Sequence, residues 1–197
     1  MSVDASYFYG KIVKSLTNQY IPLVTRIIDK CVIPGKQEVE LFRKNLESTM
    51  NSIKENLNAK YMTFRVGFIN PLFITKSVEV MNYLYTIMFP KLYAKSKDDF
   101  DEISEEEIFM SVMMQTCSNL WYSRHLFAIT DLIDSDDGIE NGMRNMTLMS
   151  KNIMYARKNS IMKIIRKSIK DGIEMAMSNI YITNLQRERL MDMKEIT

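Results

Sequence analysis

Apolar residues recur every three or four positions through residues 39–64, and this is the most regular pattern in the chain. The steps are 3, 4, 4, 3, 4, 4 and 3 for Val39, Phe42, Leu46, Met50, Ile53, Leu57, Tyr61 and Phe64. Such spacing places the eight side chains on one face of an α-helix. An eleven-residue repeat is typical of a nearly straight helix, so the sequence predicts a single helix here.

Two neighbouring segments show the same helical spacing. The first should begin after Asp4, a favourable N-cap residue, and run to Cys31, with Pro22 expected to kink or split it. Residues 33–36, which include Pro and Gly, then end it. Another helix is predicted over residues 74–92, with a break near Pro90.

The residues between these two helices, 62–75, are compatible with two structures. Met62, Phe64, Val66 and Phe68 alternate with polar or small residues, which is the period of a β-strand. The turn at 70–71 could then close a small hairpin. The alternative, which we favour, is the end of a helix followed by a loop.

The clearest helix start in the sequence is at Ser104. Ser104 and Glu107 have the spacing of a capping box, and Ile103 and Ile108 that of a hydrophobic staple. Glutamates at 105–107 favour the positive end of the helix dipole. Apolar residues then surround most of the helix, so we predict a central helix at about 104–130.

From residue 143 onward the pattern is helical to about residue 195, with a weak point at Gly172. A single helix of this length would extend about 80 Å, so we expect it to be broken or to project. Six Gly and four Pro in 197 residues favour long helices. The sequence therefore predicts an all-α fold: an irregular helical bundle over 1–142 and a C-terminal helical region, 143–197, that packs on it or projects.

The net charge is only +2, but its distribution is uneven. Residues 98–140 hold twelve Asp and Glu and one Arg, whereas residues 141–170 hold eight Lys and Arg and no acidic residue. Within the basic segment, four cations share one helical face at i, i+3, i+4 and i+7. We call this set the basic ridge: Lys163, Arg166, Lys167 and Lys170, with Arg157 and Lys158 on the preceding turns as further candidates for binding.

The basic ridge has three interpretations. The acidic segments 98–107 and 131–140 could dock on it within the same chain, which we favour on the charge pattern alone. It could instead bind nucleic-acid phosphates, which need Lys and Arg. Aromatic residues for base stacking are few, however, because only Tyr155 and Tyr181 flank it. It could also bind an acidic protein or a membrane surface.

Cysteine and histidine offer little chemistry in this chain. The chain has two cysteines, Cys31 and Cys117, and one histidine, His125. A zinc site built from Cys and His needs three or four ligands at characteristic spacing. Cys117 and His125 lie eight residues apart, about 12 Å along a helix, so they cannot form a catalytic pair locally. We expect both cysteines to be buried, reduced thiols.

Other catalytic and ligand-binding patterns are also missing from the sequence. No glycine-rich phosphate loop is present. The acidic loop 131–140 departs from the EF-hand pattern, because aligning Gly138 with its invariant glycine puts Ile133 and Arg144 at the first and last ligand positions. We therefore expect no catalytic residue, no cofactor and no metal site, and hence not an enzyme.

Residues 119–124 (NLWYSR) resemble the Asn-Trp-Gly-Arg element of Bcl-2-like proteins, although the glycine is missing. The resemblance implies a helical protein that binds its partner in a groove, and we keep it as one alternative. The leading expectation is a non-enzymatic structural or interaction protein with a protein partner or self-association. Nucleic-acid binding through residues 144–170 is the second.

Several features bear on where such a protein works. The longest apolar stretch, 108–129, contains Gln115, Asn119, Arg124 and His125, so no transmembrane segment is expected. The first 20 residues show no secretory signal. The abundance of Ile, Asn and Lys, which have AT-rich codons, suggests an AT-rich genome, such as that of a large DNA virus or a protist. We expect a cytoplasmic protein, or a virion component if the gene is viral.

Overall fold

The computed structural model describes residues 2–31, 39–66, 68, 70–95, 100–123 and 148–195. These residues form seven helices and no strand, so the predicted all-α fold is confirmed. The helices are α1 (Ser2–Cys31), α2 (Val39–Glu55), α3 (Leu57–Arg65), α4 (Pro71–Met88), α5 (Pro90–Lys95), α6 (Glu105–Tyr122) and α8 (Leu148–Glu195).

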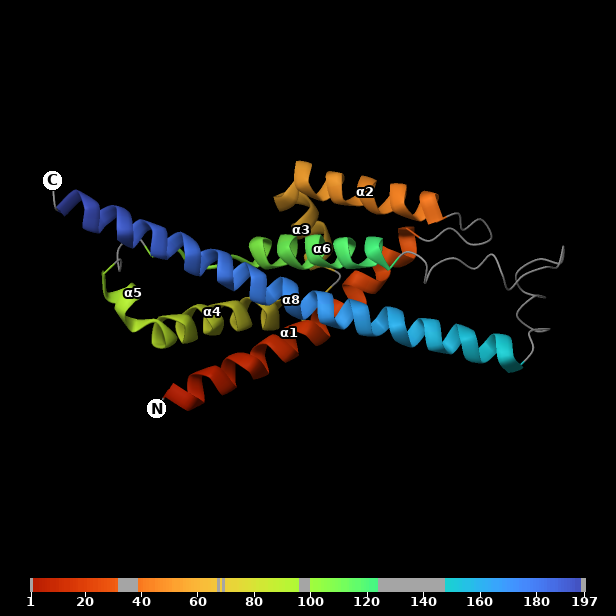
Figure 1. Cartoon of the computed structure of the whole chain (residues 1–197), viewed down its shortest axis with the longest axis horizontal. Coiled ribbons are helices and arrows are strands. Elements are labelled where there is room, and N and C mark those ends of the chain that lie inside the picture. Colours follow the sequence, from red (N-terminus) through yellow and green to blue (C-terminus); the bar gives the residue numbers. More distant parts are fainter. Residues whose placement is uncertain are drawn as a thin grey trace.

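The long helix α8 runs across the whole molecule, and the other helices gather along one side of it (Figure 1). Its most extensive contact is with α6, and it also packs on α1 and α5. On the far side of α6 lies α2, while α4 packs on α1. Both ends of α8 extend past this group of helices, so the C-terminal region packs on the bundle and also projects from it (Figure 1).

The core lies where α1, α4, α6 and α8 meet. Its fully buried members come from segments far apart in the sequence: Leu16, Tyr20, Ile74, Met81, Phe109, Leu120, Ile165 and Ile169. The apolar spacing read from the sequence accounts for most of them, because a face that repeats every three or four residues is the one a helix can bury. Burial of each large apolar side chain stabilises the fold by about 1.5–3 kcal/mol.

The contact between α6 and α8 is closest at Gly172. A Cβ atom built there would lie 2.6 Å from the Cα atom of Val112 and 2.9 Å from the carbonyl oxygen of Ser111. The backbones of the two helices therefore touch at a point that only glycine permits. The same interface carries one polar link, in which Asn119 donates its side-chain N–H to the hydroxyl of Ser168 at 2.9 Å.

The segment before α6 is held by two buried or half-buried asparagines from different helices. The amide of Asn82 on α4 exchanges two hydrogen bonds of 3.0 Å with the backbone of Ile103. The amide of Asn184 on α8 does the same with the backbone of Asp101, at 2.9 and 3.0 Å. Each amide satisfies one N–H and one C=O that no helix or strand pairs, so the segment is fixed on both sides.

The predicted single helix over residues 39–64 is wrong, because the chain breaks at Asn56. Asn56 has φ −146° and ψ 59°, outside the helical region, and α3 starts after it in a new direction. This change of direction carries Tyr61 to the start of α6, where its hydroxyl donates a hydrogen bond to Glu105 and its ring contacts Phe109. Tertiary contacts at α6 thus override a regular helical pattern.

The hairpin alternative for residues 62–75 is also wrong. Residues up to Arg65 belong to α3, and α4 begins at Pro71. Asn70 caps α4, since its side chain accepts a hydrogen bond from the backbone N–H of Phe73 at 3.0 Å. Proline suits the first helical position because its missing N–H has no partner there. The favoured helix end followed by a connection is confirmed.

Other helix boundaries differ from expectation in smaller ways. The first helix starts at Ser2 rather than after Asp4 and is not split at Pro22. The break near Pro90 is confirmed by the boundary between α4 and α5. The central helix ends at Tyr122, with Ser123 as its C-cap, rather than at about 130. The capping box at Ser104 is confirmed, with bonds of 3.2 and 2.7 Å.

The long helix α8 is not broken at Gly172. Its 48 residues correspond to about 72 Å. The expectation of a weak point failed because Gly172 is where α6 packs closest, so the packing there offsets the low helix propensity of glycine.

Replacing Gly172 with Ala should destabilise the protein by about 1–3 kcal/mol, because the added methyl group forces the backbones of α6 and α8 apart. Gly10→Ala is the matched control, since nothing lies within 4 Å of its added Cβ. The control should stabilise the protein by about 0.5–1 kcal/mol through helix propensity. Thermal or urea unfolding measures both, and equal effects at the two positions would contradict the described packing.

Replacing Ser104 with Ala should cost about 1 kcal/mol of stability, because the backbone N–H of Glu107 loses its acceptor at the start of α6. Chemical denaturation monitored by circular dichroism gives the number. Ser178→Ala serves as the control, because the Ser178 hydroxyl is exposed and donates only to a carbonyl within α8. No loss at position 104 would argue against the cap.

Candidate interaction surface on the long helix

The four residues of the basic ridge lie together and are exposed. Lys163, Arg166, Lys167 and Lys170 all project into solvent from the N-terminal half of α8. The buried face of the same segment carries Ile165, Ile169 and Ile173, each no more than 1% exposed. The helix thus presents its cations on the side opposite to the one that packs on the bundle.

The two further ridge candidates, Arg157 and Lys158, also belong to α8. Lys158 is exposed on the same helix. Arg157 belongs to α8 by its backbone, but its side chain lies outside the described residues. Within the ridge, Lys170 pairs with Glu174 at 3.5 Å, and both side chains are about half exposed. An exposed pair of this kind contributes little to stability, so it leaves the ridge cationic toward a partner.

Two acidic residues of 98–107, Asp101 and Glu105, form ion pairs away from the ridge. Asp101 pairs with Arg187 at 2.8 Å, near the C-terminal end of α8. Glu105 lies 3.3 Å from Arg65 and accepts the hydrogen bond of Tyr61. These contacts favour an open ridge over docking by this segment. The second acidic segment, 131–140, lies outside the described residues.

Around Glu105, three helices meet in one polar cluster. Burial, followed by the hydrogen bond to Glu105, raises the pKa of the Tyr61 phenol far above its ordinary value, so that it stays a hydrogen-bond donor. Arg65 also donates to the hydroxyl of Thr75 on α4 at 2.9 Å. The cluster thus ties α3, α4 and the start of α6 together.

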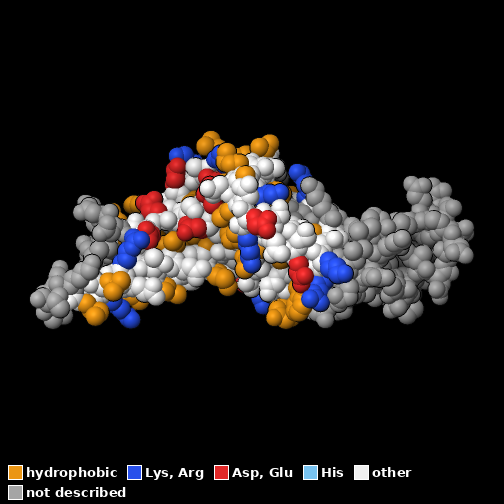
Figure 2. All heavy atoms as spheres, turned by 90° about the horizontal axis from the view of Figure 1, so that it is seen from above, with side chains coloured by type: hydrophobic (Ala, Val, Ile, Leu, Met, Phe, Trp, Pro, Cys, Tyr) orange, Lys and Arg blue, Asp and Glu red, His pale blue; other side chains and the backbone are white. Residues whose placement is uncertain are grey.

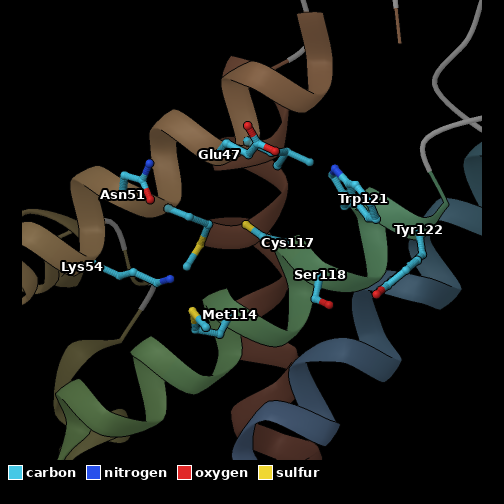
Figure 3. Close-up of a pocket in the computed structure, with 10 residues that line it drawn as sticks. Glu47, Asn51, Lys54, Met114, Cys117, Ser118, Trp121 and Tyr122 are labelled. Atoms are coloured by element: carbon cyan, nitrogen blue, oxygen red, sulfur yellow. The ribbon is translucent and has the colours of Figure 1, made fainter. Parts of the chain in front are cut away.

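A groove of about 430 Å³ lies between α2 and α6 (Figure 3). Side chains from the two helices face each other across it, including Met50 and Lys54 from α2 and Met114, Cys117 and Trp121 from α6. The Arg43 guanidinium lies 5.7 Å from the centre of the Trp121 ring, a cation–π distance. The groove is therefore partly polar, unlike the dry apolar grooves that take amphipathic helices.

Both cysteines are buried thiols outside any disulfide, as expected. Burial, with a smaller contribution from the neighbouring Cys31, raises the pKa of the Cys117 thiol to about 12. Burial also raises the pKa of Cys31, which the hydrogen bond with the Thr49 hydroxyl only partly offsets. Thiols are nucleophilic only as thiolates, so neither residue has the environment of a catalytic cysteine.

Several predicted sites fall outside the described residues, namely His125 and the acidic loop 131–140. Within the described part, no group of three or more His, Cys, Asp or Glu residues could hold a metal ion. The described helices also include none that is long and apolar enough to cross a membrane. Asn119, from the run that resembles Bcl-2-like proteins, is used in the contact between α6 and α8.

Charge of both signs is interspersed over the face shown in Figure 2, and hydrophobic side chains reach the surface between the charges. The charge pattern predicted the basic ridge, but the exposed apolar positions of α8, among them Met175, Ile182 and Leu190, were not predicted. Their spacing is the signal that reveals them, since they share one helical face.

Comparison with known proteins gives no relative for this chain: no family model, no curated protein and no solved structure matches it.

Both thiols should be almost inert toward a thiolate-specific reagent such as DTNB in the folded protein at about pH 8, because their raised pKa values leave little thiolate. After unfolding in guanidinium, both cysteines should react at the rate of ordinary thiols. Absorbance during labelling measures the two rates. Rapid modification of either cysteine in the folded state would contradict the environment described.

Proposed function

We propose that this protein is a non-enzymatic interaction or assembly protein that presents one long helix, α8, to a protein partner. The observation that carries the proposal is the basic ridge of α8: four exposed cations on one face of a long helix whose other face packs on the bundle. Both ends of this 48-residue helix extend past the other helices, which supports contacts with other molecules (Figure 1).

The charge of the ridge indicates the kind of protein partner. A row of Lys and Arg favours an acidic surface, both through complementary potential and through faster encounter. The ion pairs of Asp101 and Glu105 with Arg187 and Arg65 support this reading, since those carboxylates are used elsewhere in the fold. The ridge is therefore available to another chain rather than to the segment just before α6.

Nucleic acid is the second candidate, favoured by the spacing of the four cations along one face, which suits contacts to phosphates. We rank it lower because Tyr181, one of the two flanking aromatics, is used inside the fold. Its ring lies 4.8 Å from the ring of Phe89, the C-cap residue of α4. A ring packed in this way is not offered for stacking on bases.

A groove binder of the Bcl-2 type is the further alternative, with the groove between α2 and α6 as its binding site. The polar walls of that groove, which include Glu47 and Lys54, support it less well than the ridge supports an assembly role. We further propose an intracellular setting, or a virion if the gene is viral. Two buried thiols outside any disulfide and a composition that suggests an AT-rich genome support this setting.

Reversing the ridge with Lys163→Glu, Arg166→Glu, Lys167→Glu and Lys170→Glu should abolish binding to an acidic probe such as poly-glutamate while helix content stays unchanged. Stability should barely move, because the four side chains are exposed and their one ion pair, with Glu174, is worth little. Fluorescence anisotropy measures binding, and circular dichroism measures helix content and melting temperature.

A matched control carries the same change of charge elsewhere: Lys14→Glu, Arg26→Glu, Lys44→Glu and Lys91→Glu, all exposed and scattered over α1, α2 and α5. It should retain most of the binding. Binding of a labelled RNA or DNA that falls steeply with salt would instead favour the nucleic-acid candidate. A drop in melting temperature that reversals at Asp136 and Asp137 restore would mean that the ridge is covered within the chain.

A further inference from the structure

The C-terminal half of α8 carries a second exposed surface, distinct from the basic ridge. Five exposed residues follow one another in steps of four, three, four and four: Met175, Asn179, Ile182, Gln186 and Leu190. With about 100° of rotation per residue, they form one stripe along the helix axis. We call this set the seam. Its three apolar members are 45%, 50% and 59% exposed.

The position of the seam on α8 leaves it open to another molecule. In Figure 1, α8 passes in front of α1, and the end of the helix that follows the crossing extends to the C-terminus beyond α4 and α5. If the stripe is followed toward the N-terminus, it reaches Ser168. This residue occupies the same face of α8 as the seam but is buried, and its hydroxyl accepts a hydrogen bond from Asn119 of α6. The seam therefore has a defined beginning and lies about 140° around the helix from the centre of the ridge.

The order of residues in the seam is symmetric about its centre. Counting outward from the midpoint between residues 182 and 183, Asn179 mirrors Gln186, and Met175 mirrors Leu190. An antiparallel copy of the same helix would therefore place amide opposite amide and apolar residue opposite apolar residue, with Ile182 next to its own counterpart. Amide side chains both donate and accept hydrogen bonds, so such a pair satisfies itself.

The charges beside the seam fit the same arrangement. Asp171 lies beside its N-terminal end, and Arg189 lies on the same side of the seam at its C-terminal end. In an antiparallel pair the basic end of one helix lies beside the acidic end of the other, which is favourable at both ends. In a parallel pair like charges would face each other at each end.

We propose that the occupant of the seam is a second copy of this chain, and that two α8 helices pair antiparallel about a two-fold axis at Ile182. A self-complementary patch is the signature of an isologous dimer, because the same residues serve both sides. The inference rests on the proposed function in one respect, that α8 is an assembly element, and it names the partner for the half of α8 that the ridge does not use.

The mass of the full-length protein tests the dimer. Light scattering or sedimentation across a concentration series should show a reversible dimer of two 23.1 kDa chains. Leu190→Glu should weaken dimerisation roughly a hundredfold or more, because both copies place a carboxylate in an apolar contact. Leu72→Glu is the matched control, a leucine 66% exposed on α4, and it should dimerise normally. A monomer at all concentrations, or equal effects of the two variants, overturns the proposal.

Disulfide cross-linking between cysteines introduced in the seam tests the antiparallel register of the two α8 helices. Met175→Cys alone should not cross-link under mild oxidation, because the two copies of that position lie about 22 Å apart along the paired helices. A mixture of Met175→Cys and Leu190→Cys proteins should form the mixed disulfide dimer. The native cysteines are buried and give a low background. Cross-linking of Met175→Cys to itself, or no mixed dimer, overturns the antiparallel arrangement.

The two proposals fail separately. The four ridge substitutions should leave dimerisation intact, because they lie on another face of α8. Loss of the ridge effect with a normal dimer contradicts only the acidic partner. A monomer whose ridge still binds an acidic probe contradicts only the seam.

Discussion

The close backbone contact between Gly172 of α8 and Val112 of α6 is the constraint on which the rest of the described structure depends. With the Cα atom of Val112 only 2.6 Å from where a Cβ would stand, the two backbones meet without a side chain between them. This contact brings the buried isoleucines of α8 into the same core cluster as Phe109 and Leu120 of α6. Every other helix packs on one or both members of this pair.

Polar groups then fix the register around that contact. Asn82 and Asn184 hold the segment 101–103 from opposite sides by pairing with its backbone. Tyr61 and Arg65 reach the same region from α3 and meet at Glu105 in the first turn of α6. Buried hydrogen bonds of this kind add little net stability when made but cost about 1–3 kcal/mol when one partner is lost. They therefore select one arrangement of the helices over others with similar apolar burial.

Different stretches of α8 have different surroundings. Its middle is used to assemble the bundle, so the four cations before the crossing and the seam after it are both left at the surface. The two surfaces differ in chemistry, since one is cationic and the other is apolar with alternating amides. We therefore propose a different complement for each, an acidic surface for the ridge and a like surface for the seam.

The sequence by itself determined the helical nature of the chain, the cap of α6 at Ser104 and the basic ridge. These depend on spacing and on local hydrogen bonds, which neighbouring residues specify. Only the tertiary structure decided the break at Asn56 and the continuity of α8 through Gly172. In the first case the contact of Tyr61 with Glu105 outweighs a regular apolar repeat. In the second, a residue that weakens an isolated helix becomes the one that allows two helices to touch, because the cost of glycine is local and its benefit depends on a partner 60 residues earlier in the chain.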